Sequence, residues 1–161
     1  MGLFFPEMNS NPSSHIPSKI LILGVGNILM SDDGISAYIC SQIDAMHLPG
    51  VTTHIVHQLH VELIEDLLNY DSVIIADASI KEKEVEFFPL QPDKTQTLSS
   101  SHHLNANMLN TLLQKVYGKT IPIFLCAVRG DNFEIGEIFS VQTMKNANNA
   151  IKIICDWIKK Q

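Results

Sequence analysis

The stretch KILILGVGNILMSDDG, residues 19–34, constrains the fold of this chain more than any other part of its sequence. It opens with an apolar run at residues 20–23, which predicts a strand buried on both faces, as in the centre of a parallel sheet. Gly24, Gly26 and Asn27 tolerate backbone angles that other residues avoid, so the chain can turn tightly where the strand ends. We therefore expect a loop at the carboxyl end of this strand.

Two adjacent carboxylates, Asp32 and Asp33, close that predicted loop. In open α/β sheets, ligands bind outside the carboxyl ends of the strands. The acidic pair is therefore a candidate binding site before any other part of the chain is considered.

Apolar periodicity in the rest of the chain predicts helices that alternate with strands. This alternation favours an α/β fold: a three-layer α/β/α sandwich with a mainly parallel, twisted sheet and helices on both faces. The expected helices cover residues 35–46, 61–68, 105–117 and 141–160, the last with Ser140 as N-cap. The expected strands cover residues 51–56, 73–76, 85–90 and 121–128, with residues 85–90 at an edge.

The length of 161 residues fits a single domain, which we place at residues 19–161 after a flexible N-terminal tail at residues 1–18. The formal charge of −6 and the absence of any Lys/Arg cluster argue against nucleic acid and anionic membranes as partners. No apolar run approaches the roughly 20 residues of a membrane helix.

The cysteines lie in apolar contexts without CxxC spacing, which predicts small buried side chains in a reducing, cytoplasmic protein: Cys40, Cys126 and Cys155. We expect a monomer, because no apolar helix face is left over once the sheet is covered.

Three polar side chains are expected above the same edge of the sheet: Asp33, Asp77 and His102. Two carboxylates and an imidazole suit a divalent ion such as nickel or zinc, with open positions for ligands from a partner. Each residue also has a simpler interpretation. Asp33 can be the N-cap of the helix that follows, Asp77 can merely end a strand, and His102 can be a polar loop residue.

Other chemistries fit the sequence less well. A dinucleotide fingerprint requires a third glycine at Leu29 and an acidic residue where His57 stands, so NAD is not expected. A GxSxG nucleophile elbow is absent. A cysteine nucleophile near His102 stays open, although no cysteine precedes a glycine-rich turn. His57 and His60 can share one helical face as ligands, but capping or surface roles are the commoner use of such residues.

Three segments together resemble the nickel-iron hydrogenase maturation endopeptidases. They are GVGNILMSDDG at residues 24–34, VIIADA at residues 73–78 and SSHHLN at residues 100–105. Their order and spacing match over nearly the whole chain after residue 18. Two segments resemble a subgroup of that family: HQLHVELIEDL at residues 57–67, and residues 117–140, which include FEIGEIFS. Ser36 stands where a glycine is common in the family.

The resemblance implies an enzyme that removes a short C-terminal peptide from the hydrogenase large-subunit precursor once nickel has been inserted. It places Asp33 and Asp77 at the two acidic metal contacts and His102 at the histidine contact, with His103 as an adjacent alternative. The nickel is then carried by the substrate rather than held permanently by the enzyme. Asp33 or Asp77 would activate the attacking water, or the metal would polarise the scissile carbonyl. The alternatives are a non-catalytic nickel-dependent chaperone of the large subunit and an unrelated metal-dependent small-molecule hydrolase.

Overall fold

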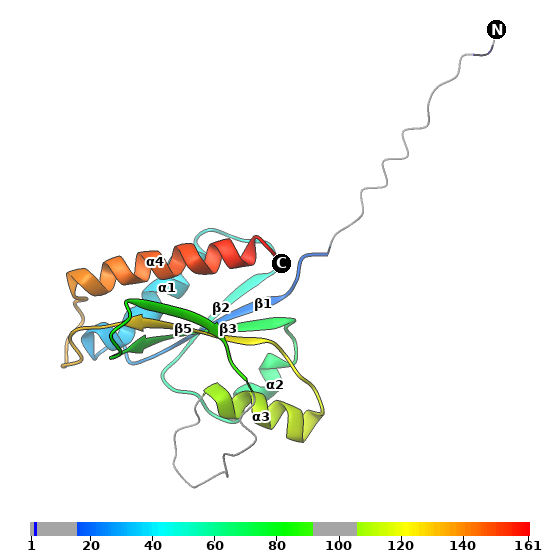
Figure 1. The fold of residues 1–161 in the computed structure, drawn as a ribbon, viewed down its shortest axis with the longest axis horizontal. Coiled ribbons are helices and arrows are strands. Elements are labelled where there is room, and N and C mark those ends of the chain that lie inside the picture. Colours follow the sequence, from blue (N-terminus) through cyan, green and yellow to red (C-terminus); the bar gives the residue numbers. More distant parts are fainter. Residues whose placement is uncertain (1, 3–15, 92–105) are drawn as a thin grey trace.

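A five-stranded sheet crosses the middle of the protein in the computed structural model, which describes residues 2, 16–91 and 106–161 (Figure 1). The strands lie in the order β2-β1-β3-β5-β4, and all are parallel except β4, which runs antiparallel to β5. Their bounds are β1 Ile20–Val25, β2 Val51–Val56, β3 Ser72–Ser79, β4 Val85–Pro89 and β5 Ile123–Arg129. The strand expected at residues 85–90 is thus an edge strand, as its charged approach predicts.

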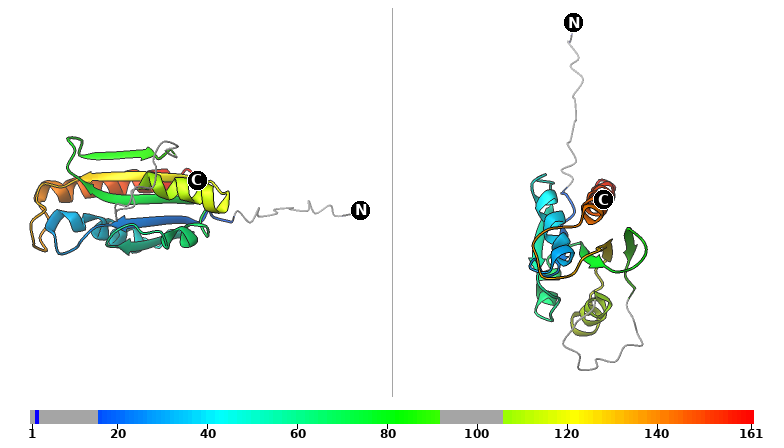
Figure 2. Two further views of the ribbon diagram at one scale, coloured as in Figure 1. Left: turned by 90° about the horizontal axis from the view of Figure 1, so that it is seen from below. Right: turned by 90° about the vertical axis from the view of Figure 1, so that its left-hand side faces the viewer.

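Helices cover both faces of this sheet, so the predicted three-layer α/β/α architecture is confirmed (Figures 1 and 2). Helices α1 (Ile35–Asp44) and α4 (Val141–Ile158) pack on one face. Helices α2 (Leu63–Leu67) and α3 (Ala106–Tyr117) pack on the other. A single 3-10 turn, η1 (Ser31–Gly34), joins the loop after β1 to α1.

Alternating side chains of the central strands build two separate cores, which is why β1 lacks the polar positions of a half-exposed strand. Ile20 and Ile22 point toward α1 and α4, whereas Leu21 and Leu23 point toward α2 and α3. Strand β3 divides in the same way, with Ile74 on the first side and Val73 and Ile75 on the second.

Two expected elements differ in length from those observed. Strand β3 does not stop at Ala76 but continues to Ser79, because it stays paired with β5 as far as the Ser79–Arg129 register. Asp77 therefore lies inside a strand rather than at its end. The helix expected at residues 61–68 is reduced to the five residues of α2, of which Leu63, Ile64 and Leu67 are buried.

The strand order places a topological switch point between β1 and β3. The chain leaves β1 toward β2 on one side of the sheet and returns to β3 on the other side of β1. The carboxyl ends of both strands open on the same edge, seen from the front in the right-hand view of Figure 2. Ligands bind at such crevices in open α/β sheets.

Three further sequence predictions concern the cysteines, membrane-spanning helices and the extent of the domain. All three cysteines are free thiols; Cys40 and Cys126 are fully buried, while Cys155 is half-buried. Among the helices of the described residues, none has the length and apolarity to cross a membrane. The single domain at residues 19–161 stays a prediction, and of the tail at residues 1–18 all but residues 2 and 16–18 lie outside the described part.

Candidate functional site

The loop after β1 holds Asp33 in a fixed position at the carboxyl edge of the sheet. Asp33 lies in η1, and its Oδ2 accepts a hydrogen bond of 2.8 Å from the backbone N–H of Asn27. Gly26, with φ at +149°, passes so close that a Cβ there would overlap the carbonyl oxygen of Asp33. A glycine is thus required for this loop to close on the carboxylate. The N-cap of α1 is Gly34, so the interpretation of Asp33 as its N-cap is wrong.

Asp77 faces the same site from the neighbouring strand. It pairs in register with Val25, the last residue of β1, which sets it at the mouth of the loop that carries Asp33. Two residues after Ile75, it lies on the sheet face that α2 and α3 cover. Burial, and next the negative charge of Asp33, raise the pKa of Asp77 to about 6. The structure therefore brings these two predicted residues together as an interacting pair of carboxylates.

The electrostatic interaction between the two carboxylates is directly measurable. In an Asp33→Asn variant, the pKa of Asp77 is expected to fall below that in the wild type, because the repelling charge is gone while burial remains. The side-chain carboxyl carbon of Asp77, followed by NMR as a function of pH, reports this pKa. The matched control is Asp156→Asn, which removes an exposed carboxylate from the last turns of α4. An unchanged pKa in Asp33→Asn would contradict the pairing.

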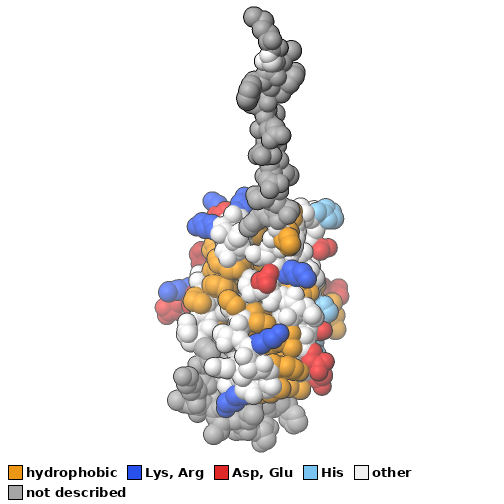
Figure 3. Space-filling model, turned by 90° about the vertical axis from the view of Figure 1, so that its right-hand side faces the viewer, with side chains coloured by type: hydrophobic (Ala, Val, Ile, Leu, Met, Phe, Trp, Pro, Cys, Tyr) orange, Lys and Arg blue, Asp and Glu red, His pale blue; other side chains and the backbone are white. Residues whose placement is uncertain are grey.

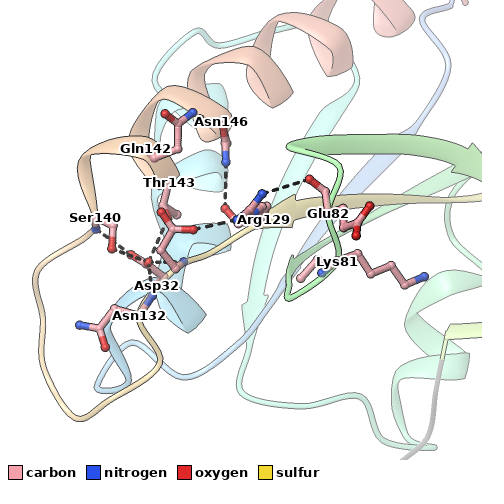
Figure 4. A network of polar contacts seen from close by, with 11 residues as sticks. Asp32, Lys81, Glu82, Arg129, Asn132, Ser140, Gln142, Thr143 and Asn146 are labelled. Atoms are coloured by element: carbon pink, nitrogen blue, oxygen red, sulfur yellow. Dashed lines mark hydrogen bonds and ion pairs between the residues drawn. The ribbon is translucent and has the colours of Figure 1, made fainter.

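Asp32, next to Asp33 in the sequence, has a different environment and a role that sequence analysis missed. Its side chain is fully buried and accepts five hydrogen bonds of 2.7–2.9 Å (Figure 4). Burial raises the pKa of Asp32, but the hydrogen bonds outweigh this effect and lower it to about 2. The donors are the N–H groups of Asp131, Asn132 and Ser140 and the hydroxyls of Ser140 and Thr143.

These contacts fasten the loop after β1 to the loop that connects β5 with α4. Ser140 is the N-cap residue of α4, as predicted, but its hydroxyl donates to Asp32 instead of capping its own helix. A buried carboxylate at the N-terminus of a helix is favoured by the helix dipole. The spacing of Ser140 and Thr143 in the sequence signals a helix start, but nothing local to it points to an acceptor more than 100 residues away.

Of the four histidines considered as ligands, two lie within the described residues and two lie outside them. The predicted ligand His102 and its alternative His103 lie outside the described residues. His57 and His60 are exposed, and His60 Nδ1 lies 3.5 Å from Glu62 Oε2, as expected for surface residues. Within residues 2, 16–91 and 106–161, no group of three His, Cys, Asp or Glu side chains is placed to hold a metal ion. Asp33 and Asp77 alone offer two carboxylates, which do not complete a metal site.

The fold and the site define a class of protein: a doubly covered, mainly parallel sheet with paired carboxylates at its topological switch point. No model of a known protein family matches the chain. A protein of Methanocaldococcus jannaschii that is assigned to the hydrogenase maturation proteases is 24% identical over 158 residues, which span 88% of this chain and 97% of the relative. The hydrogenase 2 maturation protease of Escherichia coli is 36% identical over 67 residues, 40% of this chain and 41% of the relative.

Solved structures of two hydrogenase maturation proteases align with the fold of this chain. The hydrogenase maturating endopeptidase HybD of Escherichia coli aligns with a TM-score of 0.70 at 23% identity, covering 88% of this chain and 93% of that one. The hydrogenase maturation protease HycI of Thermococcus kodakarensis aligns with a TM-score of 0.66 at 20% identity, covering 88% and 93%. The resemblance found in the sequence motifs is thus confirmed by relatives in both sequence and fold.

Proposed function

We propose that this protein is an endopeptidase that removes a C-terminal peptide from the precursor of a nickel-iron hydrogenase large subunit. The observation that carries the proposal is the pairing of Asp33 and Asp77 at the switch point, on a chain whose relatives are named as maturation proteases. The substrate is a protein that already contains nickel.

The two carboxylates, with His102, complete the coordination of the nickel that the precursor carries on its own cysteines. Two half-buried carboxylates that repel each other form a site that a divalent cation stabilises, because the cation neutralises both charges. In this proposal Asp33 and Asp77 provide two ligands, and the remaining ligands come from His102 and from the substrate. His102 precedes α3 by a few residues, and α3 covers the face toward which Asp77 points.

Binding of the nickel would fix the C-terminal junction of the precursor beside the carboxylates. Positioning of this kind contributes several kcal/mol to catalysis in favourable cases. Asp33 Oδ2 is oriented by the Asn27 N–H, whereas Asp33 Oδ1 accepts no hydrogen bond from the described residues. A carboxylate oxygen of Asp33 or Asp77 then takes a proton from the attacking water as a general base, or the metal polarises the scissile carbonyl.

The test is a cleavage assay with the purified protein and the large-subunit precursor from the same genome, prepared with and without nickel. Intact mass is expected to show loss of a C-terminal fragment only from the nickel-loaded precursor. A variant that combines Asp33→Asn with His102→Ala should bind the precursor and leave it uncut, because two of the three metal contacts are gone. Asp156→Asn serves as the control and should cleave like the wild type.

Three outcomes would overturn the proposal in distinguishable ways. Normal cleavage by the double variant would remove Asp33 and His102 from the mechanism. Binding of the precursor without release of any fragment by the wild type would favour the nickel-dependent chaperone. Tight nickel binding by the isolated protein would favour a hydrolase with a resident metal.

A further inference from the structure

Large apolar side chains gather at the carboxyl edge of the sheet, around the loops that carry the candidate site. Each is more than half exposed, and isolated side chains of this kind are normal on a protein surface. Here they are concentrated on two neighbouring loops and the first residue of α4. Such a concentration is unusual, and contiguous exposed apolar surface marks interaction sites. We name them the apolar rim: Ile28, Leu29, Ile135, Ile138 and Val141.

Backbone hydrogen bonds hold the two loops of the apolar rim together. Gly136 N–H donates to the carbonyl of Leu29, and Ser31 N–H donates to the carbonyl of Gly136. The Ser31 hydroxyl donates to the carbonyl of Glu134 at 2.8 Å. Below them, Asp32 ties the base of both loops to α4 (Figure 4). The exposed side chains therefore stand on a rigid support, so their binding would not require ordering of the backbone.

Acidic side chains are interspersed with the apolar rim on the loop between β5 and α4. Arg129 lies 3.6 Å from Asp131 and balances its charge. Glu134 and Glu137 are exposed, and neither forms an ion pair with any of the described residues. At the opposite edge, Figure 3 shows blue and red side chains mixed among orange ones. The rim thus combines apolar contact area with uncompensated negative charge.

We propose that the apolar rim with Glu134 and Glu137 is a docking surface for the protein substrate, and that the docked part of the substrate presents apolar side chains flanked by Lys or Arg. The proposal rests on the proposed function. Charge complementarity selects this occupant, because the surface carries carboxylates on a chain whose formal charge is −6. Continuity supports it too, since η1 with Asp33 follows directly on the loop of Ile28 and Leu29.

The experiment measures the affinity of the protein for the metal-free precursor, so that contacts of Asp33 and Asp77 with nickel do not enter. Ile135→Ser combined with Ile138→Ser is expected to raise Kd by about 10- to 100-fold, as for central apolar residues of an interface. Glu134→Lys combined with Glu137→Lys should raise Kd at low salt and weaken its salt dependence. With nickel-loaded precursor, the cleavage defect should appear in KM.

Matched controls change the same kinds of residue elsewhere. Val116→Ser removes an exposed apolar side chain from α3, and Asp156→Lys reverses an exposed charge on α4. Wild-type Kd in the rim variants would overturn the docking surface while leaving the proteolytic function intact. A wild type that neither binds nor cuts the precursor would overturn both. A dimer of the wild type that the isoleucine variants abolish would assign the rim to a second copy of this chain instead.

Discussion

Replacing Asp32 by alanine is expected to lower the free energy of unfolding by roughly 3–5 kcal/mol at neutral pH. The substitution leaves the donors of five hydrogen bonds without their acceptor at the base of two loops. Urea denaturation followed by circular dichroism measures the loss. If this variant does not fold, Thr143→Ala removes a single donor and should cost about 1 kcal/mol.

The neighbouring carboxylate provides the control. Asp33→Ala removes an acceptor that has one backbone donor, and it also relieves the repulsion on Asp77. Its expected cost is under about 1 kcal/mol. Equal losses at the two positions would contradict the division of the acidic pair into one structural residue and one candidate functional residue.

The stabilisation by Asp32 also has a defined pH range. Its pKa is lowered from 3.8 to about 2 in the folded protein, so the folded state favours the ionised form. The contribution is fully present above about pH 4 and is lost as the pH falls toward 2. The difference in unfolding free energy between the wild type and Asp32→Ala should therefore shrink over that interval.

The second large effect is expected from Asp77→Asn, with opposite signs for activity and stability. Cleavage of nickel-loaded precursor should fall by a factor of about 100 or more, because a carboxylate that contacts the metal or activates water is lost. The free energy of unfolding at pH 7 should rise by on the order of 1–2 kcal/mol. The gain arises because ionised Asp77 is disfavoured in the folded state, where its pKa is about 6.

The pH dependence of stability distinguishes this account from a general folding defect. In the wild type, a raised pKa means that the Asp77 contribution is present below about pH 4 and declines as the pH rises through 6. Asp77→Asn should lack this decline. Asp156→Asn, which alters an exposed carboxylate, should match the wild type in both cleavage and stability. A variant at Asp77 that lost activity and stability together would contradict the prediction.

The local sequence was sufficient to predict most of the fold. The apolar run before Gly24 predicts a central strand because only a doubly covered strand is apolar at every position, and β1 is buried throughout. The amphipathic pattern after Ser140 predicts a helix, and α4 begins at Val141. The bounds of the short helix α2 were harder to predict, because five residues give little more than one turn of periodicity.

The candidate site was predictable only in part. Asp33 and Asp77 follow from a rule about the carboxyl ends of parallel strands, and they do lie together. Asp32 could not be distinguished from Asp33 by sequence, because its partners come from a loop and a helix about 100 residues away. The continuation of β3 beyond Asp77 could not be predicted either, because it depends on pairing with β5, which is distant in the sequence.

The continuation of β3 past Asp77 gives the site a direction of approach. Strands β1 and β2 end level with Asp77, at Val25 and Val56, whereas β3 and β5 run on to Ser79 and Arg129. Two residues of strand raise a step of about 7 Å along one side. For the proposed function, a chain end that reaches both carboxylates would meet this step on the side of β3 and β5 and the loop of Gly26 and Asn27 on the side of β1. These two longer strands would then limit how far a substrate tail advances past the peptide bond that is cleaved.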